Sequence, residues 1–171
     1  NRVGSRRKIA PFLLRYGLDV NEFSSPPASY RTFNEFFFRR LKPGARPIAA
    51  DPRVAVFPAD GRHLGFQDAS KVKGIFAKGQ QFDIPTLVGD RNLGERYARG
   101  TIVCSRLCPV DYHRFHFPVA GIPHAPIAID GALFSVNPIA LRRNLSYLWQ
   151  NKRQRVSIDA GPFGLVTIVA I

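Results

Sequence analysis

Apolar and polar positions follow one pattern up to residue 46 and another beyond it. In residues 5–18, basic side chains stand beside aliphatic and aromatic ones, a pattern typical of a short amphipathic helix, with Gly17 as its stop signal. Thr32 and Glu35 have the spacing of a capping box directly before three phenylalanines, which predicts a second helix that ends at Pro43-Gly44. We therefore expect residues 1–46 to form a basic, membrane-associating helical segment.

Beyond Pro47, short apolar runs are broken by glycine and proline, a pattern typical of β-strands joined by turns. The expected fold class is α+β and mostly β, with N-terminal amphipathic helices followed by a barrel-like or sandwich-like catalytic domain over residues 47–171. The predicted strands are 54–57, 74–76, 101–103, 127–129, 132–136, 155–158 and 165–171, with a short helical piece near 139–151.

The last apolar run, residues 164–171, has a β-branched strand pattern and reaches the end of the chain with no turn after it. A domain seldom stops in the middle of a buried strand. We therefore expect either that the chain is a fragment or that another polypeptide completes its sheet.

Three consecutive phenylalanines, Phe36, Phe37 and Phe38, cannot share one face of a helix. At least one of them must therefore meet something other than the local core, such as another element, a partner chain or lipid. In the first helix, an apolar run lies beside basic residues, which suits either a membrane interface or a cap on the domain core. The candidate membrane contacts are Phe12, Leu13, Leu14, Phe36, Phe37 and Phe38.

Composition and charge narrow the class of protein. Apolar residues make up 45% and charged residues 22% of the 171 residues, a globular balance that excludes a disordered or collagen-like chain. The formal net charge of +13, concentrated at the two ends, suits an anionic partner, either nucleic acid or an acidic membrane leaflet, although solubility explains it equally well. Two cysteines indicate free thiols in a reducing compartment.

The residues best suited to chemistry lie in one stretch near the middle of the chain. His113 and His116 stand three apart and close to Asp111, and histidine exchanges protons near neutral pH. On a strand the two rings would face opposite sides, which favours two separate roles. Cys104, Cys108 and the two histidines could also bind zinc, but their spacing is tighter than that of the usual zinc finger, so we expect no metal.

A further candidate is Asp60, which follows an apolar run in the sequence Pro58-Ala59-Asp60-Gly61. Asp-Gly is common at tight turns, so this carboxylate could serve the turn alone. It could also orient a histidine, as the aspartate of a nucleophilic triad does. No serine of the chain lies in a nucleophile-elbow pattern, so a hydrolase with its own serine is poorly supported.

Four blocks of the chain, in order, resemble the β-chain portion of the phosphatidylserine decarboxylase family. Any one block alone would be weak evidence for the family, but four blocks in the expected order are strong evidence. The resemblance spans residues 30–171. A weaker match is Lys78-Gly79 followed by Leu87-Val88-Gly89. The four blocks are FNEFF and LKPGARP at 33–37 and 41–47, PADG at 58–61, DYHRFHFP at 111–118 and GALFSVNP at 131–138.

The resemblance implies a self-processing decarboxylase that converts phosphatidylserine to phosphatidylethanolamine at a membrane surface. Enzymes of this family cut themselves before a serine, which becomes a pyruvoyl cofactor at the start of a small α chain. By resemblance, Asp60 and His116 fall on the positions that form a triad with that serine, and His113 falls on the histidine that protonates the carbanion after CO2 leaves. The implied partners are the α chain, phosphatidylserine and an anionic membrane, with a homodimer left open and no nucleic acid.

Two departures from the family pattern leave alternatives open. No Gly-Ser-Thr site occurs in the chain, so the pyruvoyl residue is not part of it. Asn151-Lys152-Arg153 replaces the Asn-Glu-Arg often found, and some relatives with Asn-Lys-Arg act on other substrates. A decarboxylase of a soluble amino acid and a non-catalytic basic lipid-binding module therefore stay as alternatives. We expect peripheral membrane association on the reducing side.

Overall fold

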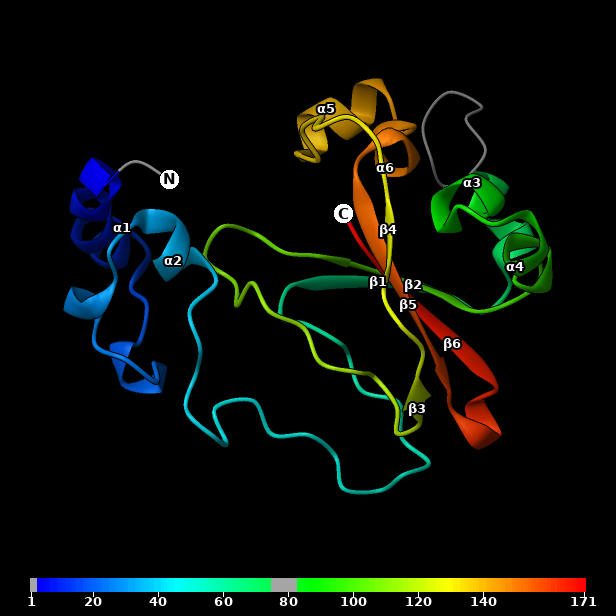
Figure 1. Cartoon of the computed structure of the whole chain (residues 1–171), viewed down its shortest axis with the longest axis horizontal. Helices are drawn as coiled ribbons and strands as arrows, with labels where there is room; N and C mark the ends of the chain where they lie inside the picture. The colour runs from blue at the N-terminus through cyan, green and yellow to red at the C-terminus, as the bar shows by residue number, and fades with distance from the viewer. Residues whose placement is uncertain (1–2, 75–82) are drawn as a thin grey trace. The chain divides into compact units, whose positions relative to one another are not determined.

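The computed structural model describes residues 3–74 and 83–171 (Figure 1), and the chain divides into two compact units. Unit 1 comprises Asn1–His63 and Ser105–Pro118, and unit 2 comprises Leu64–Cys104 and Val119–Ile171. Residues 47–63 and 105–118, which the sequence pattern assigns to the β-rich part, thus group with the N-terminal residues.

Unit 1 begins with the helix predicted over residues 5–18. A 3-10 helix, η1 (Val3–Lys8), runs into α1 (Ile9–Tyr16), and Gly17 ends it in the left-handed conformation with φ 60°. The Gly17 N–H donates to the Leu13 carbonyl, which satisfies one of the free carbonyls at the helix end. The predicted helix and its stop signal are therefore confirmed. Two 3-10 turns follow, η2 (Val20–Glu22) and η3 (Pro27–Ser29).

The second helix, α2 (Phe33–Phe37), starts as predicted and ends sooner than predicted. The Thr32 hydroxyl accepts from the Glu35 N–H at 3.0 Å, and the Glu35 carboxylate accepts from the Arg31 N–H at 2.6 Å. The predicted end at Pro43-Gly44 is wrong because Leu41 forms an antiparallel bridge with Phe23. That pairing requires extended backbone well before the proline.

The core of unit 1 is built around the Phe36 ring, which is 0% exposed. It lies 5.6–6.1 Å, centroid to centroid, from four other rings in tilted and edge-on arrangements that aromatic side chains favour. Its neighbours in this cluster are Phe12, Phe23, Tyr30 and Phe33, with Ile9, Leu13, Leu18 and Leu41 packed around them. Burial of Phe36 fixes the direction of the two phenylalanines that follow it.

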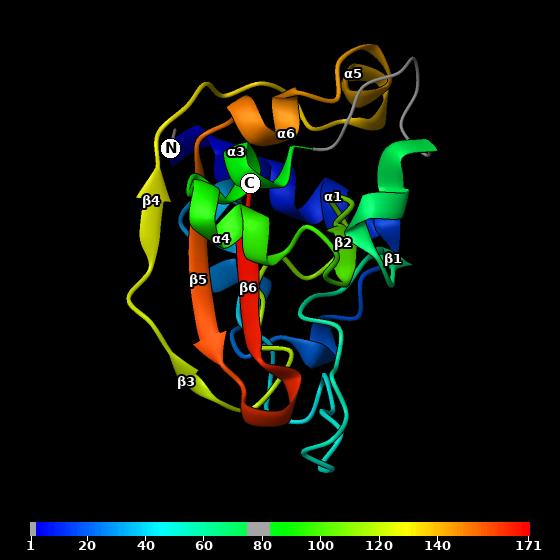
Figure 2. The same cartoon turned by 90° about the vertical axis from the view of Figure 1, so that its right-hand side faces the viewer.

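Unit 2 is organised around an antiparallel sheet whose long central strand is β5 (Arg153–Asp159). On one side β5 pairs over residues 154–159 with β6 (Leu165–Ala170), and the two strands lie side by side in Figure 2. On its other side it pairs with β3 (Ile122–Pro123) and β4 (Ile127–Ile129). Among the described residues no strand pairs with the outer edge of β6.

A second sheet has two strands, β1 (Arg62–Phe66) and β2 (Ile102–Arg106), and the division between the units falls within them. The chain is therefore α+β, as expected. In the described part of the chain neither sheet closes into a barrel. Of the strands predicted from the sequence, those near 101, 127, 155 and 165 are confirmed as β2, β4, β5 and β6.

The two faces of β5 differ in chemistry. Val156 and Ile158 are buried on one face, where Ile158 packs with Val119 and Ala160. The opposite face carries the polar side chains of the alternate positions, and two short helices, α3 (Ile84–Val88) and α4 (Arg91–Arg96), lie over it (Figure 2). The helical piece predicted near 139–151 is confirmed as two short helices, α5 (Pro138–Arg143) and α6 (Tyr147–Gln150).

Two predicted strands are wrong. Residues 54–57 lie between Pro52 and Pro58, which offer no N–H groups. Outside the local turn, their one backbone hydrogen bond to other described residues runs from the Val56 N–H to the Pro118 carbonyl. Residues 132–136 are held instead by the Asn151 side chain, which accepts from the Phe134 N–H at 2.6 Å and donates to the Phe134 carbonyl at 2.9 Å.

Two further 3-10 helices lie in unit 2, η4 (Ala69–Gly74) and η6 (Gly161–Phe163). The strand predicted over 74–76 and the weak family match at Lys78-Gly79 lie mostly or wholly outside the described residues.

Candidate active site

The two histidines lie on an irregular segment and not on a strand, so the expectation that their rings face opposite sides of a strand does not apply. β2 ends at Arg106, and residues 107–118 after it form no regular helix or strand. The His116 N–H donates to the Pro58 carbonyl at 2.8 Å, and the Val56 N–H donates to the Pro118 carbonyl at 2.9 Å. These bonds hold the histidine segment of unit 1 against the residues that lead to Asp60.

Asp60 precedes a turn that requires glycine. Gly61 has φ 123°, a conformation that other residues rarely adopt, and an added Cβ there would collide with the Arg106 carbonyl. The Asp-Gly turn predicted from the sequence is therefore present. It fixes the position of the carboxylate relative to the start of the histidine segment.

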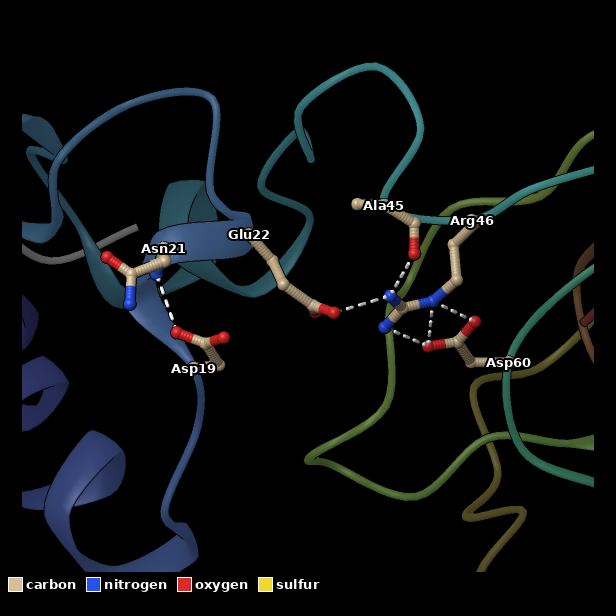
Figure 3. A network of polar contacts seen from close by, with 6 residues as sticks. All are labelled: Asp19, Asn21, Glu22, Ala45, Arg46 and Asp60. Carbon is tan, nitrogen blue, oxygen red and sulfur yellow. Dashed lines mark hydrogen bonds and ion pairs between the residues drawn. The ribbon is translucent and has the colours of Figure 1, made fainter.

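The Asp60 carboxylate is held by Arg46 in a two-point ion pair (Figure 3). Arg46 Nε donates to Asp60 Oδ1 at 2.8 Å and Nη2 donates to Oδ2 at 2.8 Å. These hydrogen bonds lower the pKa of the Asp60 carboxyl below its usual value, while its partial burial opposes them. Asp60 is therefore ionised at neutral pH.

Arg46 is itself oriented by a second carboxylate. Its Nη1 donates to Glu22 Oε1 at 3.0 Å and to the Ala45 carbonyl at 2.7 Å, as Figure 3 shows. Hydrogen bonds to Asp60 and then to Glu22 raise the pKa of the Arg46 guanidinium. The cation is thus fixed between an acid from η2 and the acid of the Asp-Gly turn.

His113 is half-buried and stacked on a phenylalanine. Its ring lies 3.9 Å from that of Phe37, with 23° between the planes, and its Nε2 lies 3.0 Å from the Cys108 carbonyl. A carbonyl only accepts, so Nε2 carries the proton and Nδ1 of the neutral ring is left as the site of proton exchange. Burial lowers the pKa of His113, against opposing contributions from the Cys108 carbonyl and from Asp111.

Arg39 places a buried positive charge in the same unit. Only 4% of the residue is exposed, and its guanidinium stacks on the rings of Phe23 and Phe36 at 4.7 and 5.0 Å. Burial lowers the pKa of Arg39. Within the described residues, its Nε and Nη1 have no hydrogen-bond partner. This cation contributes to lowering the pKa of both Asp60 and His113.

Unit 1 therefore contains all three predicted catalytic residues, Asp60, His113 and His116. The Asp60 carboxylate bonds with Arg46 and with the backbone of Tyr112. In the part of the chain that the structure describes, no hydrogen bond is recorded between the side chains of Asp60 and His116. The assignment of this pair to self-cleavage stays a prediction, as does the assignment of His113 to decarboxylation.

The three phenylalanines of α2 and its end meet three different environments. Phe36 is in the core, Phe37 stacks on His113, and Phe38 is 43% exposed. In α1, Phe12 and Leu13 pack against the core, whereas Leu14 is 87% exposed. Phe36 is buried and is therefore not available for the predicted membrane contact, whereas Leu14 and Phe38 are exposed.

None of the helices within 3–74 and 83–171 combines the length and the apolar character needed to cross a bilayer.

The two cysteines are free thiols, as expected. Burial raises the pKa of Cys104, which makes it a poor thiolate. Across the described residues, no group of three or more histidine, cysteine, aspartate or glutamate side chains is arranged to hold a metal.

The Asn151-Lys152-Arg153 segment has a structural explanation. Asn151 holds Phe134, and the buried Arg153 donates to the Leu87 and Thr86 carbonyls of α3. Lys152 points outward and lies 3.8 Å from the exposed Asp130 carboxylate. The departure from the usual family sequence therefore falls on a surface position.

Sequence reasoning missed Arg46, Glu22 and Arg39. Arg46 lies inside the matched LKPGARP block, which singled out the segment but gave this residue no role. Glu22 and Arg39 carry no local pattern that distinguishes them from other surface charges. Only the fold shows that Arg39 is buried and that Arg46 forms ion pairs with two carboxylates.

Comparison with known proteins identifies relatives along nearly the whole chain. Residues 33–171 match the family model described as phosphatidylserine decarboxylase. A "Phosphatidylserine decarboxylase proenzyme" of Chlamydia trachomatis serovar D is 41% identical over 167 residues, covering 98% of this chain and 56% of the relative. The proenzyme of the same name from Chlamydia muridarum is 42% identical over 167 residues, with the same coverage of 98% and 56%.

A relative from a eukaryote is nearly as similar. "Phosphatidylserine decarboxylase proenzyme 3" of Schizosaccharomyces pombe is 40% identical over 169 residues, which are 98% of this chain and 18% of that protein. The chain thus spans a little over half the length of the chlamydial relatives that it matches.

Proposed function

The chain belongs to the phosphatidylserine decarboxylase family, and on that basis we propose that the protein containing it converts phosphatidylserine to phosphatidylethanolamine. The match over residues 33–171 carries this proposal, since the geometry of unit 1 alone does not specify a lipid. The matched relatives are longer than this chain and are named proenzymes, which supports a second chain produced from the same precursor.

The residues of unit 1 fit the pyruvoyl group that the family implies. A pyruvoyl group supplies an electrophilic carbonyl that withdraws electrons as CO2 leaves. The chain's own contribution is proton transfer. Its ionised Asp60 suits that work, as does its half-buried His113, whose Nδ1 has no hydrogen-bond partner among the described residues. We place the group near these residues and assign it no contact.

Two proton-transfer roles follow for the chain's own residues. His116 takes the proton from the hydroxyl of the cleavage-site serine, and the ionised Asp60 stabilises the imidazolium that forms. For this, Asp60 must share its oxygens between Arg46 and the histidine. His113 acts in the later step, giving a proton from Nδ1 to the carbon that CO2 has left.

Basic and exposed apolar side chains of unit 1 support the choice of a lipid substrate. The basic residues of η1, Arg6, Arg7 and Lys8, precede the exposed Leu14, and Phe38 is exposed after α2. Cationic side chains beside exposed apolar ones favour binding to the surface of an anionic bilayer. We propose that the protein is a peripheral membrane enzyme.

The proposal is tested with the full-length precursor. After expression, denaturing gels should show two chains, and the purified protein should release CO2 from phosphatidylserine in vesicles and not from free serine. Release from free serine with none from the lipid would favour the soluble amino-acid alternative. An uncut protein with no activity on either substrate would contradict the proposal.

A further inference from the structure

Alternate residues of β5 place polar side chains on one face of the sheet in unit 2. Those on either side of Arg155 along this face each have a hydrogen-bond partner. Arg153 donates to carbonyls of α3, and the Ser157 hydroxyl lies 2.7 Å from that of Thr167. Asp159 pairs with His124 at 2.7 Å. A sheet face covered by helices usually buries apolar groups, so this row of partnered polar groups is unusual.

Arg155 is the exception in this row. Its side chain is 11% exposed, and Nη2 donates to Asp90 Oδ2 at 3.2 Å. Its Nε and Nη1 are buried and, among the described residues, have no hydrogen-bond partner. Leaving charged N–H groups buried without an acceptor is costly, so such groups in a folded protein point to an acceptor that completes the site.

A cavity of about 330 Å³ lies beside this guanidinium, within unit 2. Arg96 and His124 also line it, and Ile127 and Leu165 give it apolar walls. Asp90 lines it too, but its carboxylate is already engaged by the N–H of Leu93 and by Arg155. Two arginines against one engaged carboxylate leave the cavity positive.

We propose that this cavity binds a phosphate ester. Arg155 carries more positive charge than its single bond to Asp90 meets, Arg96 adds a second cation, and guanidinium groups bind phosphate oxygens through charge-assisted hydrogen bonds. The volume is at the small end of ligand sites, which suits a phosphate with a short polar substituent. The ligand is either a phospholipid headgroup or a free phosphate. None of the lining residues belongs to the set proposed for processing and decarboxylation.

Calorimetric titration of the full-length processed protein distinguishes the two sources. One titrant is inorganic phosphate, and the other is dihexanoyl phosphatidylglycerol below its micelle-forming concentration. Tighter binding of the short-chain lipid identifies a headgroup site, and tighter binding of phosphate identifies a free-phosphate site. Absence of binding to either titrant overturns the proposal, whatever the decarboxylase activity of the same preparation.

Arg155→Gln should weaken binding of the preferred titrant by about tenfold or more, since it removes a charge-assisted donor. The control is Arg91→Gln, because Arg91 lies on α4 with an exposed side chain paired to Glu95 and does not line the cavity. Equal weakening by the two variants would overturn the proposal. If Arg155→Gln fails to fold, Arg96→Gln replaces it with an expected loss of about threefold, and unchanged affinity there would overturn the proposal as well.

Discussion

At the level of single residues, Arg46 decides the charge of the candidate site. It binds Asp60 at two points and Glu22 at a third, so the Asp60 carboxyl stays ionised. The sequence predicts Asp60 as a candidate from a four-residue block, but it does not predict the cation. The partners lie in separate segments of unit 1, and their meeting depends on the fold of the loop between residues 47 and 59.

Replacing Arg46 with glutamine should lower the free energy of unfolding by about 1–2 kcal/mol at pH 7, because it leaves two carboxylates without their shared cation. The pKa of Asp60 is lowered in the folded state, so this stabilisation is present above pH 3.8 and is lost as the pH falls through the lower folded value. Urea unfolding of the full-length protein at several pH values measures the difference.

The matched control is Arg53→Gln. Arg53 also pairs with an aspartate, Asp51, but its side chain is 85% exposed. We expect no measurable loss of unfolding free energy for an ion pair this exposed. Equal losses for the two variants would show that the Arg46 network is an ordinary surface ion pair.

Removal of the Phe37 ring tests the environment of His113. Burial lowers the pKa of His113 below 6.5, and Phe37→Ala should raise it by admitting water. A histidine that donates a proton is active when charged, so kcat falls as the pH rises through its pKa. The falling limb of the pH profile should therefore move to higher pH in Phe37→Ala.

Phe57→Ala is the control for that profile, because Phe57 stacks on a different histidine, His63, at 3.8 Å. In Phe57→Ala the falling limb of the kcat–pH profile should lie at the same pH as in the wild type. A limb that stays fixed in Phe37→Ala, or moves to lower pH, would contradict the role given to His113.

At the level of elements, the sequence predicts those with a local signal and misses those set by distant contacts. Gly17 correctly marks the C-terminal end of α1, and the Thr32–Glu35 capping box correctly marks the start of α2. The early end of α2 depends on pairing between Leu41 and Phe23. These residues are far apart in the sequence, so no local pattern predicts their pairing. Residues 132–136 have a strand pattern, yet they form only an isolated backbone bridge at Ala132, and the Asn151 side chain takes up the N–H and the carbonyl of Phe134.

The short helices α3 and α4 begin with N-cap aspartates, a local signal that was not among the predicted elements. Asp83 accepts from the Thr86 N–H at 2.9 Å, and Asp90 accepts from the Leu93 N–H at 3.0 Å. Each aspartate is an N-cap three residues before its donor. Helices of this length bury too few apolar residues to show helical periodicity.

The exposed side of α1 gives a prediction about membrane binding. Leu14→Ser should weaken binding to phosphatidylglycerol vesicles by about tenfold, because an exposed leucine no longer enters the lipid. Its unfolding free energy should not change measurably. Vesicle co-sedimentation and thermal unfolding of the full-length protein measure the two effects.

Two comparisons control for that variant. Phe12→Ser should lower the unfolding free energy by about 2–3 kcal/mol, because the partly buried Phe12 packs on Phe33 and Phe36. Leu133→Ser replaces a leucine of unit 2 that is 89% exposed and should leave vesicle binding unchanged. If Leu14→Ser binds vesicles as wild type does, α1 serves only to cover the core.

At the level of the whole molecule, the chain is an α+β member of a decarboxylase family that spans little more than half of its chlamydial relatives. Order and spacing of four short blocks were sufficient to indicate the family from sequence. The barrel-like or sandwich-like closure was not predictable from those blocks, because strand pairing is set by contacts between distant segments. The outer edge of β6 has no recorded partner strand among the described residues, which leaves the expected completion of the sheet a prediction.

The central claim is that two histidines three residues apart serve two successive steps. Wild-type, Asp60→Ala, His116→Ala and His113→Ala precursors are expressed in full length, and each is scored for cleavage on a denaturing gel and for CO2 release from phosphatidylserine. We expect Asp60→Ala and His116→Ala to stay uncut. His113→Ala should be cut normally and lose turnover by about 10²–10⁴-fold. An uncut His113→Ala beside a normally cut His116→Ala would reverse the roles, and normal cleavage and turnover in both would contradict the claim.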